Sequence, residues 1–215
     1  MVNVKLCGLQ TEADVDAAIE AEATHGGFIV QAPESHRNLD LGEAADLVDQ
    51  ASEELTTVIV TPSDEPDRAR EAIEKTSADV LQASGDIAPG KLAEIGEDTD
   101  ADIWKAVGLT DEAHETIAEV DRYAEAGTDA VVLDALEAGY GGHGEQIDWG
   151  HANHVRRSIA IGTVLAGGLT IDNVAEAVET VDPWCVDVSS GIETDEANDP
   201  DKMQAFVQAA WEARS

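Results

Sequence analysis

The sequence predicts an α/β fold, a single (β/α)₈ barrel that occupies residues 1–215 as one domain. Short apolar runs recur along the chain, and amphipathic helical patterns lie between them. A chain of 215 residues is long enough for one barrel and short for two ordinary domains. About eight strands that alternate with about eight helices are typical of a parallel TIM barrel.

The predicted strands are apolar segments of about four to six residues, rich in Val, Ile or Leu. Such runs suit strands buried on both faces, as a closed parallel sheet requires. The dinucleotide fingerprint G-x-G-x-x-G/A of many open sheets is absent after Cys7. In chain order the segments are Val2–Cys7, Gly27–Gln31, Thr57–Thr61, Asp79–Ala83, Asp102–Val107, Ala130–Asp134, Thr163–Ala166 and Trp184–Ser189.

The helices are predicted from amphipathic patterns between these strands. The first has a capping-box-like start, because Asp14 follows Thr11 by three residues. We expect a short helix at best in Pro89–Ile95, a weaker one in Asp148–Ser158, and an exposed acidic loop over Asp195–Asp201. The other helical patterns cover Leu41–Ala51, Pro66–Lys75, Thr110–Ala126, Thr170–Thr180 and Asp201–Ala213.

The charge balance is extreme, with 46 acidic against 12 basic residues and a formal net charge of −34. The acids are scattered along the chain, as in proteins of salt-accumulating halophiles, and we expect salt cations at the surface. An ordinary acidic protein with cationic partners is the alternative. Nucleic acid is not expected as a partner, because its binding needs a basic face.

Targeting and metal signals are missing from the sequence. No apolar run approaches the roughly 20 residues that span a bilayer, and the N-terminus does not resemble a signal peptide. We therefore expect a cytoplasmic protein without a membrane partner. Cys7 and Cys185 form no disulfide framework or paired metal motif, so neither metal nor cofactor is expected. Cys185 is expected in the core, and solvent-facing positions are expected for His25, His114, His151 and His154.

The chemistry of a barrel lies at the C-terminal ends of its strands. Alternation along the first strand puts Lys5 and Cys7 on the same side, toward the barrel interior. Cys7 is either a general base or a small buried apolar residue. Asp134 ends the sixth strand as an acid/base candidate or a cap. Asp187 is expected to face Lys5, either as a structural ion pair or as a substrate contact.

Glycine-rich loops follow the last three strands, and they predict a phosphorylated ligand. Backbone N–H groups approach an anion closely where glycine leaves space. Phosphate sites in barrels are frequently built from the loops after strands seven and eight. The candidate phosphate-binding residues are Gly142, Gly144, Gly167, Gly168, Ser189, Ser190 and Gly191.

At these residues the chain resembles phosphoribosylanthranilate isomerase, an enzyme of tryptophan biosynthesis. The matching segments follow the family's order and span nearly the whole chain. They are Lys5-Leu6-Cys7-Gly8-Leu9, Leu133-Asp134, Gly141-Gly142-His143-Gly144 with Asp148-Trp149, Leu165-Ala166-Gly167-Gly168-Leu169, and Val186-Asp187-Val188-Ser189-Ser190-Gly191-Ile192-Glu193.

The resemblance implies a metal-free Amadori rearrangement of a small phosphoribosyl substrate. Asp134 matches the family's acid and Cys7 its base, and Arg37 matches the arginine over the anthranilate. Gln82 is kept as a substrate contact, but Ser84 stands where the family usually has His. The loop after the second strand also lacks the usual aromatic residue and lysine.

A thiolate is hard to form in so acidic a protein, and we take Lys5 as the cation that favours it at Cys7. The alternatives are another phosphosugar barrel, such as an indole-glycerol-phosphate synthase or an imidazole-pathway isomerase, and a non-catalytic barrel that binds a phosphorylated ligand. The sequence leaves the oligomeric state open.

Overall fold

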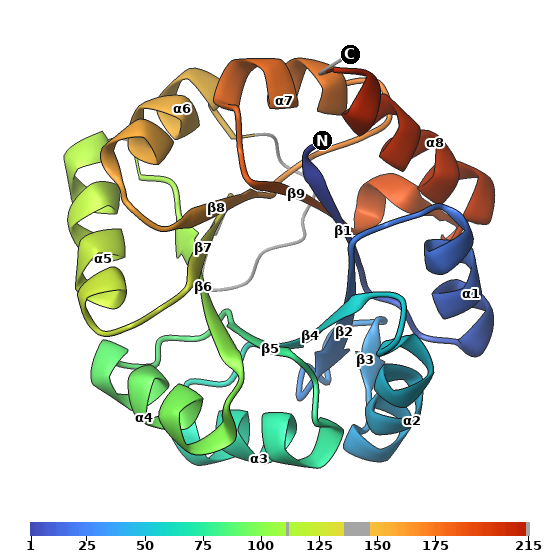
Figure 1. Cartoon of the computed structure of the whole chain (residues 1–215), viewed down its shortest axis with the longest axis horizontal. Helices are drawn as coiled ribbons and strands as arrows, with labels where there is room; N and C mark the ends of the chain where they lie inside the picture. The colour runs from blue at the N-terminus through green and yellow to red at the C-terminus, as the bar shows by residue number, and fades with distance from the viewer. Residues whose placement is uncertain (111, 136–146, 214–215) are drawn as a thin grey trace.

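The barrel of the computed structural model is closed by eight parallel strands within the described residues, which are 1–110, 112–135 and 147–213. The strand order β1-β9-β8-β7-β6-β5-β4-β2 returns to β1, which pairs with both β9 and β2 (Figure 1). This confirms the predicted (β/α)₈ fold. The strands are β1 Asn3–Cys7, β2 His25–Val30, β4 Thr56–Thr61, β5 Val80–Ala83, β6 Asp102–Gly108, β7 Ala130–Asp134, β8 Gly162–Leu165 and β9 Cys185–Val188.

The helices form a ring around the strands (Figure 1). The expectation of a short helix at best after β5 was wrong, because α4 continues to Thr99. Leu92 and Ile95 are buried there, and Gly96 lies against Ile103. No helix of the described residues is long and apolar enough to cross a membrane. The helices are α1 Glu12–Glu20, α2 Leu41–Ala51, α3 Pro66–Thr76, α4 Pro89–Thr99, α5 Ala113–Glu125, α6 Trp149–Ser158, α7 Val174–Val181 and α8 Pro200–Glu212.

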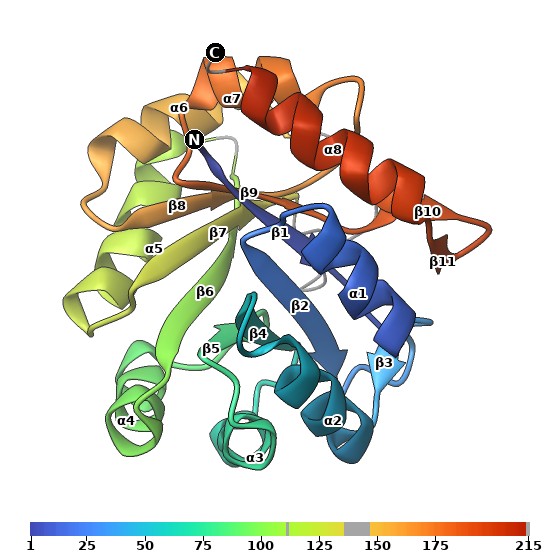
Figure 2. The ribbon, with the colours of Figure 1, turned by 45° about the vertical axis from the view of Figure 1, so that its right-hand side comes forward.

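A small hairpin stands outside the barrel between the short 3₁₀ helix η1 (Ser190–Ile192) and α8 (Figure 2). Its antiparallel strands are β10 (Glu193–Thr194) and β11 (Ala197–Asn198), and both residues of the turn, Asp195 and Glu196, have positive φ. The expectation of an exposed loop over Asp195–Asp201 holds for this turn only, because β11 and the start of α8 take up most of the remaining range. Another two-residue strand, β3 (Asn38–Leu39), extends the sheet beside β2.

The core has two layers, one inside the barrel and one between the strands and the helices. The inner layer contains Cys7, Trp104 and Cys185, and the larger outer layer is mostly Leu, Ile, Val and Ala. This alternation follows from the pleat, since successive side chains of a strand point to opposite faces. The expectation of a buried Cys185 is confirmed, because its side chain has no exposed surface.

His25 corrects another expectation, because it is buried and does not face solvent. It is 6% exposed on β2, and its ring lies 5.3 Å from the ring of Trp104 and 5.5 Å from that of Trp184. The hydroxyl of Thr24 lies 2.7 Å from its Nδ1 atom. Burial, followed by the nearby charge of Lys5, lowers the pKa of His25 to about 4.

Candidate active site

A cavity opens at the C-terminal ends of the strands, as barrel geometry predicts. Among the residues that line it are nine of the predicted site residues. Gly142 and Gly144 lie outside the described residues. The nine are Cys7, Arg37, Gln82, Asp134, Gly167, Gly168, Asp187, Ser189 and Ser190.

Lys5 and Asp187 form a buried ion pair, in which Asp187 also lines the cavity. The Lys5 ammonium donates to both carboxylate oxygens of Asp187 at 2.9 Å, and the two residues are partners in the β1–β9 ladder. Burial by itself lowers the pKa of Lys5, but the Asp187 carboxylate and the Cys7 side chain more than offset burial, so the pKa is raised. The expectation that Asp187 faces Lys5 is confirmed.

Cys7 lies two residues after Lys5 on the same face of β1, at the rim of the barrel. Its side chain is 6% exposed. Burial raises the pKa of its thiol, while Lys5 acts in the opposite direction and lowers that pKa. Gly27 of β2 leaves the space that both side chains need. A Cβ atom at Gly27 would lie 2.9 Å from the Cys7 sulfur and 3.0 Å from the Lys5 nitrogen.

Asp134 ends β7 and is partly exposed to the cavity. Its Oδ1 atom accepts a hydrogen bond of 2.7 Å from the N–H group of Ala135. Gly167 of the next loop lies against it, since a Cβ atom there would be 3.0 Å from that oxygen. The candidate acid is therefore held beside one of the predicted phosphate loops.

The loops after β8 and β9 meet at the edge of the cavity. Gly167 and Gly168 have positive φ angles of 84° and 64°, which favour glycine. A Cβ atom at Gly191 would lie 2.1 Å from the carbonyl oxygen of Leu169, so the two loops touch through glycine. The buried hydroxyl of Ser189 has no hydrogen-bond partner among the described residues. A buried polar atom of this kind suits a ligand that supplies the missing bond.

Arg37 follows β2, lines the same cavity, and pairs with Glu193 from the segment after β9. Its Nε and Nη2 atoms donate to Oε1 and Oε2 of Glu193 at 2.5 and 2.7 Å. Burial raises the pKa of Glu193, but the Arg37 guanidinium and the His36 ring outweigh burial and hold that pKa below its usual value. Glu193 belongs to a segment that matches the family, but no role was predicted for it from the sequence.

The chain is similar to known proteins over nearly its whole length. A profile of the N-(5′-phosphoribosyl)anthranilate (PRA) isomerase family matches residues 4–209. The chain belongs to the PRA isomerase family. A PRA isomerase of Natronomonas pharaonis is 39% identical over 98% of each chain. The structure of the Thermotoga maritima PRA isomerase has a TM-score of 0.85 and 28% identity, over 99% of this chain and 100% of that one.

A further solved PRA isomerase holds reduced 1-(o-carboxyphenylamino)-1-deoxyribulose 5-phosphate, abbreviated rCdRP. It has a TM-score of 0.82 and 25% identity, over 99% of this chain and 100% of that one. The resemblance to this enzyme family is thus confirmed. The Natronomonas relative comes from a halophilic archaeon, which agrees with the expectation of a salt-adapted source.

Ser84, one of the two places where the sequence was expected to depart from the family pattern, directly follows β5. Gln82 and Ser84 both line the cavity, and Gln82 is 5% exposed. The Oε1 atom of Gln82 is buried without a hydrogen-bond partner among the described residues. Because serine is much smaller than histidine, Ser84 leaves more open space on this side of the cavity than a histidine at the same position would.

Proposed function

We propose that the chain isomerises N-(5′-phosphoribosyl)anthranilate to 1-(2-carboxyphenylamino)-1-deoxyribulose 5-phosphate, with Cys7 as general base and Asp134 as general acid. The observation that carries this proposal is that a thiol and a carboxyl from separate strands line one cavity beside two glycine loops. Separate acid and base groups suit a reaction with two proton transfers.

In the proposed mechanism Asp134 donates a proton to the furanose ring oxygen. The nitrogen lone pair forms the C1′=N bond while the C1′–O bond breaks, which gives an open-chain Schiff base. The Cys7 thiolate removes the proton from C2′, and its electrons form an enolamine. The enolamine tautomerises to the ketone, so no atom is gained or lost overall.

The substrate's three parts are assigned to three parts of the cavity. Gly167, Gly168, Ser189, Ser190 and Gly191 surround the phosphate, because glycine lets backbone N–H groups approach it. Gln82 and Asp187 contact the sugar, and Arg37 contacts the carboxyphenyl group. The relative that holds rCdRP supports binding of a ligand with these three parts.

The same proposal includes the setting in which the enzyme works. Residues 1–215 act as one domain, in the cytoplasm of a salt-accumulating cell. Salt cations gather at the surface, because the chain has 46 acidic residues and only 12 basic ones.

The test is the loss of anthranilate fluorescence when N-(5′-phosphoribosyl)anthranilate is generated in situ at high KCl. We expect rapid loss with the wild-type chain and near-abolition with Cys7→Ser or with Asp134→Asn. Cys185→Ala is the matched control, because this second thiol is buried away from the cavity lining and should keep nearly full activity.

A folded wild-type chain without activity would overturn the proposal. If the chain were a non-catalytic binding protein, it would bind rCdRP without turnover. Its affinity for rCdRP would then be the same in Cys7→Ser as in the wild type. The pH profile of kcat/KM adds a second check. Since the pKa of Cys7 is raised in the free enzyme, kcat/KM should still be rising with pH above neutrality.

A further inference from the structure

Glu193 holds one edge of the Arg37 guanidinium. Its two carboxylate oxygens accept from Nε and Nη2, and each side chain is only 10% exposed. Nη1 makes no hydrogen bond to any of the described residues. A side-on pair of this kind sets the plane of the guanidinium as well as its position. The free edge is therefore left for the cavity that Arg37 lines.

Gly8 supports the side chain of Arg37 from below. Its φ is 88°, and a Cβ atom there would lie 2.6 Å from Cδ of Arg37. Arg37 thus packs closely against the backbone of Gly8, and any larger residue at position 8 would displace it. The guanidinium has a rigid support on one side and a carboxylate on another.

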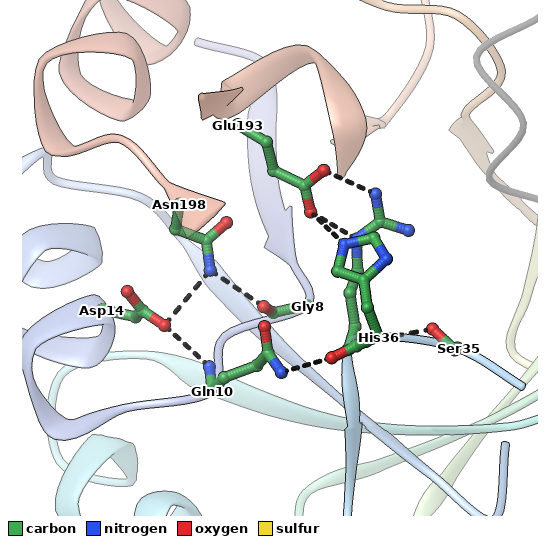
Figure 3. A network of polar contacts seen from close by, with 8 residues as sticks. Gly8, Gln10, Asp14, Ser35, His36, Glu193 and Asn198 are labelled. Carbon is green, nitrogen blue, oxygen red and sulfur yellow. Dashed lines mark hydrogen bonds and ion pairs between the residues drawn. The ribbon is translucent and has the colours of Figure 1, made fainter. Parts of the chain in front are cut away.

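Glu193 is itself fixed by a bond from α8 and by its pairing in the hairpin. The Lys202 ammonium of α8 donates to its carbonyl oxygen at 2.6 Å, and Asn198 is its partner in the hairpin. The Asn198 amide donates to the Gly8 carbonyl at 2.9 Å and to the Asp14 carboxylate at 3.2 Å (Figure 3). The hairpin is thereby tied to the loop after β1.

The backbone beside Arg37 is tied to the same loop. The Gln10 amide donates to the His36 carbonyl at 2.8 Å, and the His36 ring lies 3.3 Å from Oε1 of Glu193 (Figure 3). Three loops that are far apart in sequence, after β1, β2 and β9, are joined at one side of the cavity mouth. Their common point is the Arg37–Glu193 pair.

We propose that Glu193 is a positioning residue, which holds the free edge of Arg37 toward the carboxylate of the substrate's carboxyphenyl group. The inference rests on the proposed function, because it assigns that group to Arg37. An arginine side chain has many rotamers, and ordering it before the ligand arrives removes that entropic cost from binding. The carboxylate of Glu193 also stabilises a guanidinium that is largely removed from water.

The test is a double-mutant cycle with Glu193→Gln and Arg37→Met, because Gln keeps the shape of Glu but loses its charge. With N-(5′-phosphoribosyl)anthranilate we expect Glu193→Gln to raise KM about tenfold and to change kcat less than about threefold. In the Arg37→Met background the same substitution should change kcat/KM less than about twofold. Glu193→Asp keeps the charge and should recover part of the loss.

The matched control is Asp98→Asn, which removes a carboxylate from another arginine pair, Arg70–Asp98, on the surface. It should leave both kinetic constants unchanged. Equal losses from Glu193→Gln in the Arg37 and Arg37→Met backgrounds would overturn the proposal, as would kinetics identical to the wild type. If Glu193→Gln fails to fold at high KCl, Glu193→Asp takes its place in the cycle and is judged by the same non-additivity.

Equilibrium binding separates this proposal from the catalytic one. Glu193→Gln should weaken rCdRP about tenfold and leave the Kd of ribulose 5-phosphate, which lacks the carboxyphenyl group, unchanged. A wild-type chain that binds rCdRP without turnover would overturn the catalytic proposal. The double-mutant cycle would then be measured with the Kd of rCdRP in place of the kinetic constants. A chain that does neither overturns both.

Discussion

The Lys5 ammonium lies 2.9 Å from both carboxylate oxygens of Asp187, across the seam where β1 and β9 close the barrel. Lys5 is fully buried and Asp187 is 8% exposed. An isolated charge in such a place is very costly, so each residue requires the other. Lys5 also puts a positive charge near Cys7. Burial raises the pKa of the Cys7 thiol, and Lys5 lowers it.

Lys5→Met should therefore raise the pKa of Cys7 further. We expect the rate of Cys7 alkylation by iodoacetamide to reach its half-maximum at a higher pH than in the wild type. The measurement uses a Cys185→Ala background, so that Cys7 is the only thiol. An unchanged pH profile would contradict the role of Lys5.

Removing Lys5 alone leaves Asp187 unpaired, which typically costs about 3–5 kcal/mol in a buried pair. Lys5→Met/Asp187→Asn is the second variant, because it removes both charges together. The shift should keep its direction, since Lys5 lowers the pKa of Cys7 more than Asp187 raises it. Cys7→Ala with Cys185 retained measures background alkylation.

Gly27→Ala should reduce activity without unfolding the chain. Its new methyl group would approach the Cys7 sulfur to 2.9 Å and the Lys5 nitrogen to 3.0 Å, so the base must shift. A displacement of about 1 Å at a reacting group can cost about 100-fold in rate, and we expect kcat to fall about 10- to 100-fold.

The matched control for this substitution is Gly90→Ala in α4. A Cβ atom at Gly90 meets nothing within 4 Å, and alanine favours a helix by roughly 0.5–1 kcal/mol. Its melting temperature should stay the same or rise, with unchanged kcat. Full activity in Gly27→Ala would contradict this prediction, because it would show that the added methyl group does not displace Cys7 from its working position.

His25 should make the fold sensitive to acid. The pKa of His25 is about 4 in the folded chain, against an ordinary value of 6.5. Between these pH values the unfolded chain therefore binds a proton at His25 that the folded chain does not bind. As pH falls from 6.5 to 4, this difference should remove up to about 3 kcal/mol of stability. In His25→Gln, the free energy of unfolding measured in urea should depend less on pH between these two values.

The control is His114→Gln, because the side chain of His114 is 78% exposed. That variant should keep the wild-type dependence of unfolding free energy on pH. If His25→Gln shows the same slope as His114→Gln between those pH values, His25 is protonated equally in both states and the account given for its burial fails.

Stability should rise steeply with salt, because a formal charge of −34 repels itself less when it is screened. The Debye length falls from about 10 Å at 0.1 M to about 3 Å at 1 M salt. We expect the melting temperature to rise by about 10 °C or more between about 0.1 M and 3 M KCl. A flat melting temperature would contradict salt adaptation.

A charge-reduced variant checks the cause of that rise. Glu20, Glu53 and Glu97 are exposed and make no ion pair among the described residues. Changing all three to lysine should make the dependence of melting temperature on KCl shallower, because less repulsion remains to be screened. An equally steep dependence would point to an effect of KCl other than charge screening.

The sequence by itself determined the barrel, because strand and helix patterns are local and their alternation permits few folds. It also determined which side of β1 carries Lys5 and Cys7, since the alternation along a strand is a property of the backbone. The strand ends, where Asp134 and the glycine loops lie, followed from the same local patterns.

Only the tertiary structure decided which distant residues meet. Arg37 and Glu193 are 156 positions apart, and their pairing depends on how the loop after β2 and the hairpin after β9 are oriented. His25 is buried because Trp104 and Trp184 close over it, which its own segment does not reveal. The physical reason is that contacts of this kind depend on packing between elements, whereas the periodicity of one segment specifies only its own conformation and its buried face.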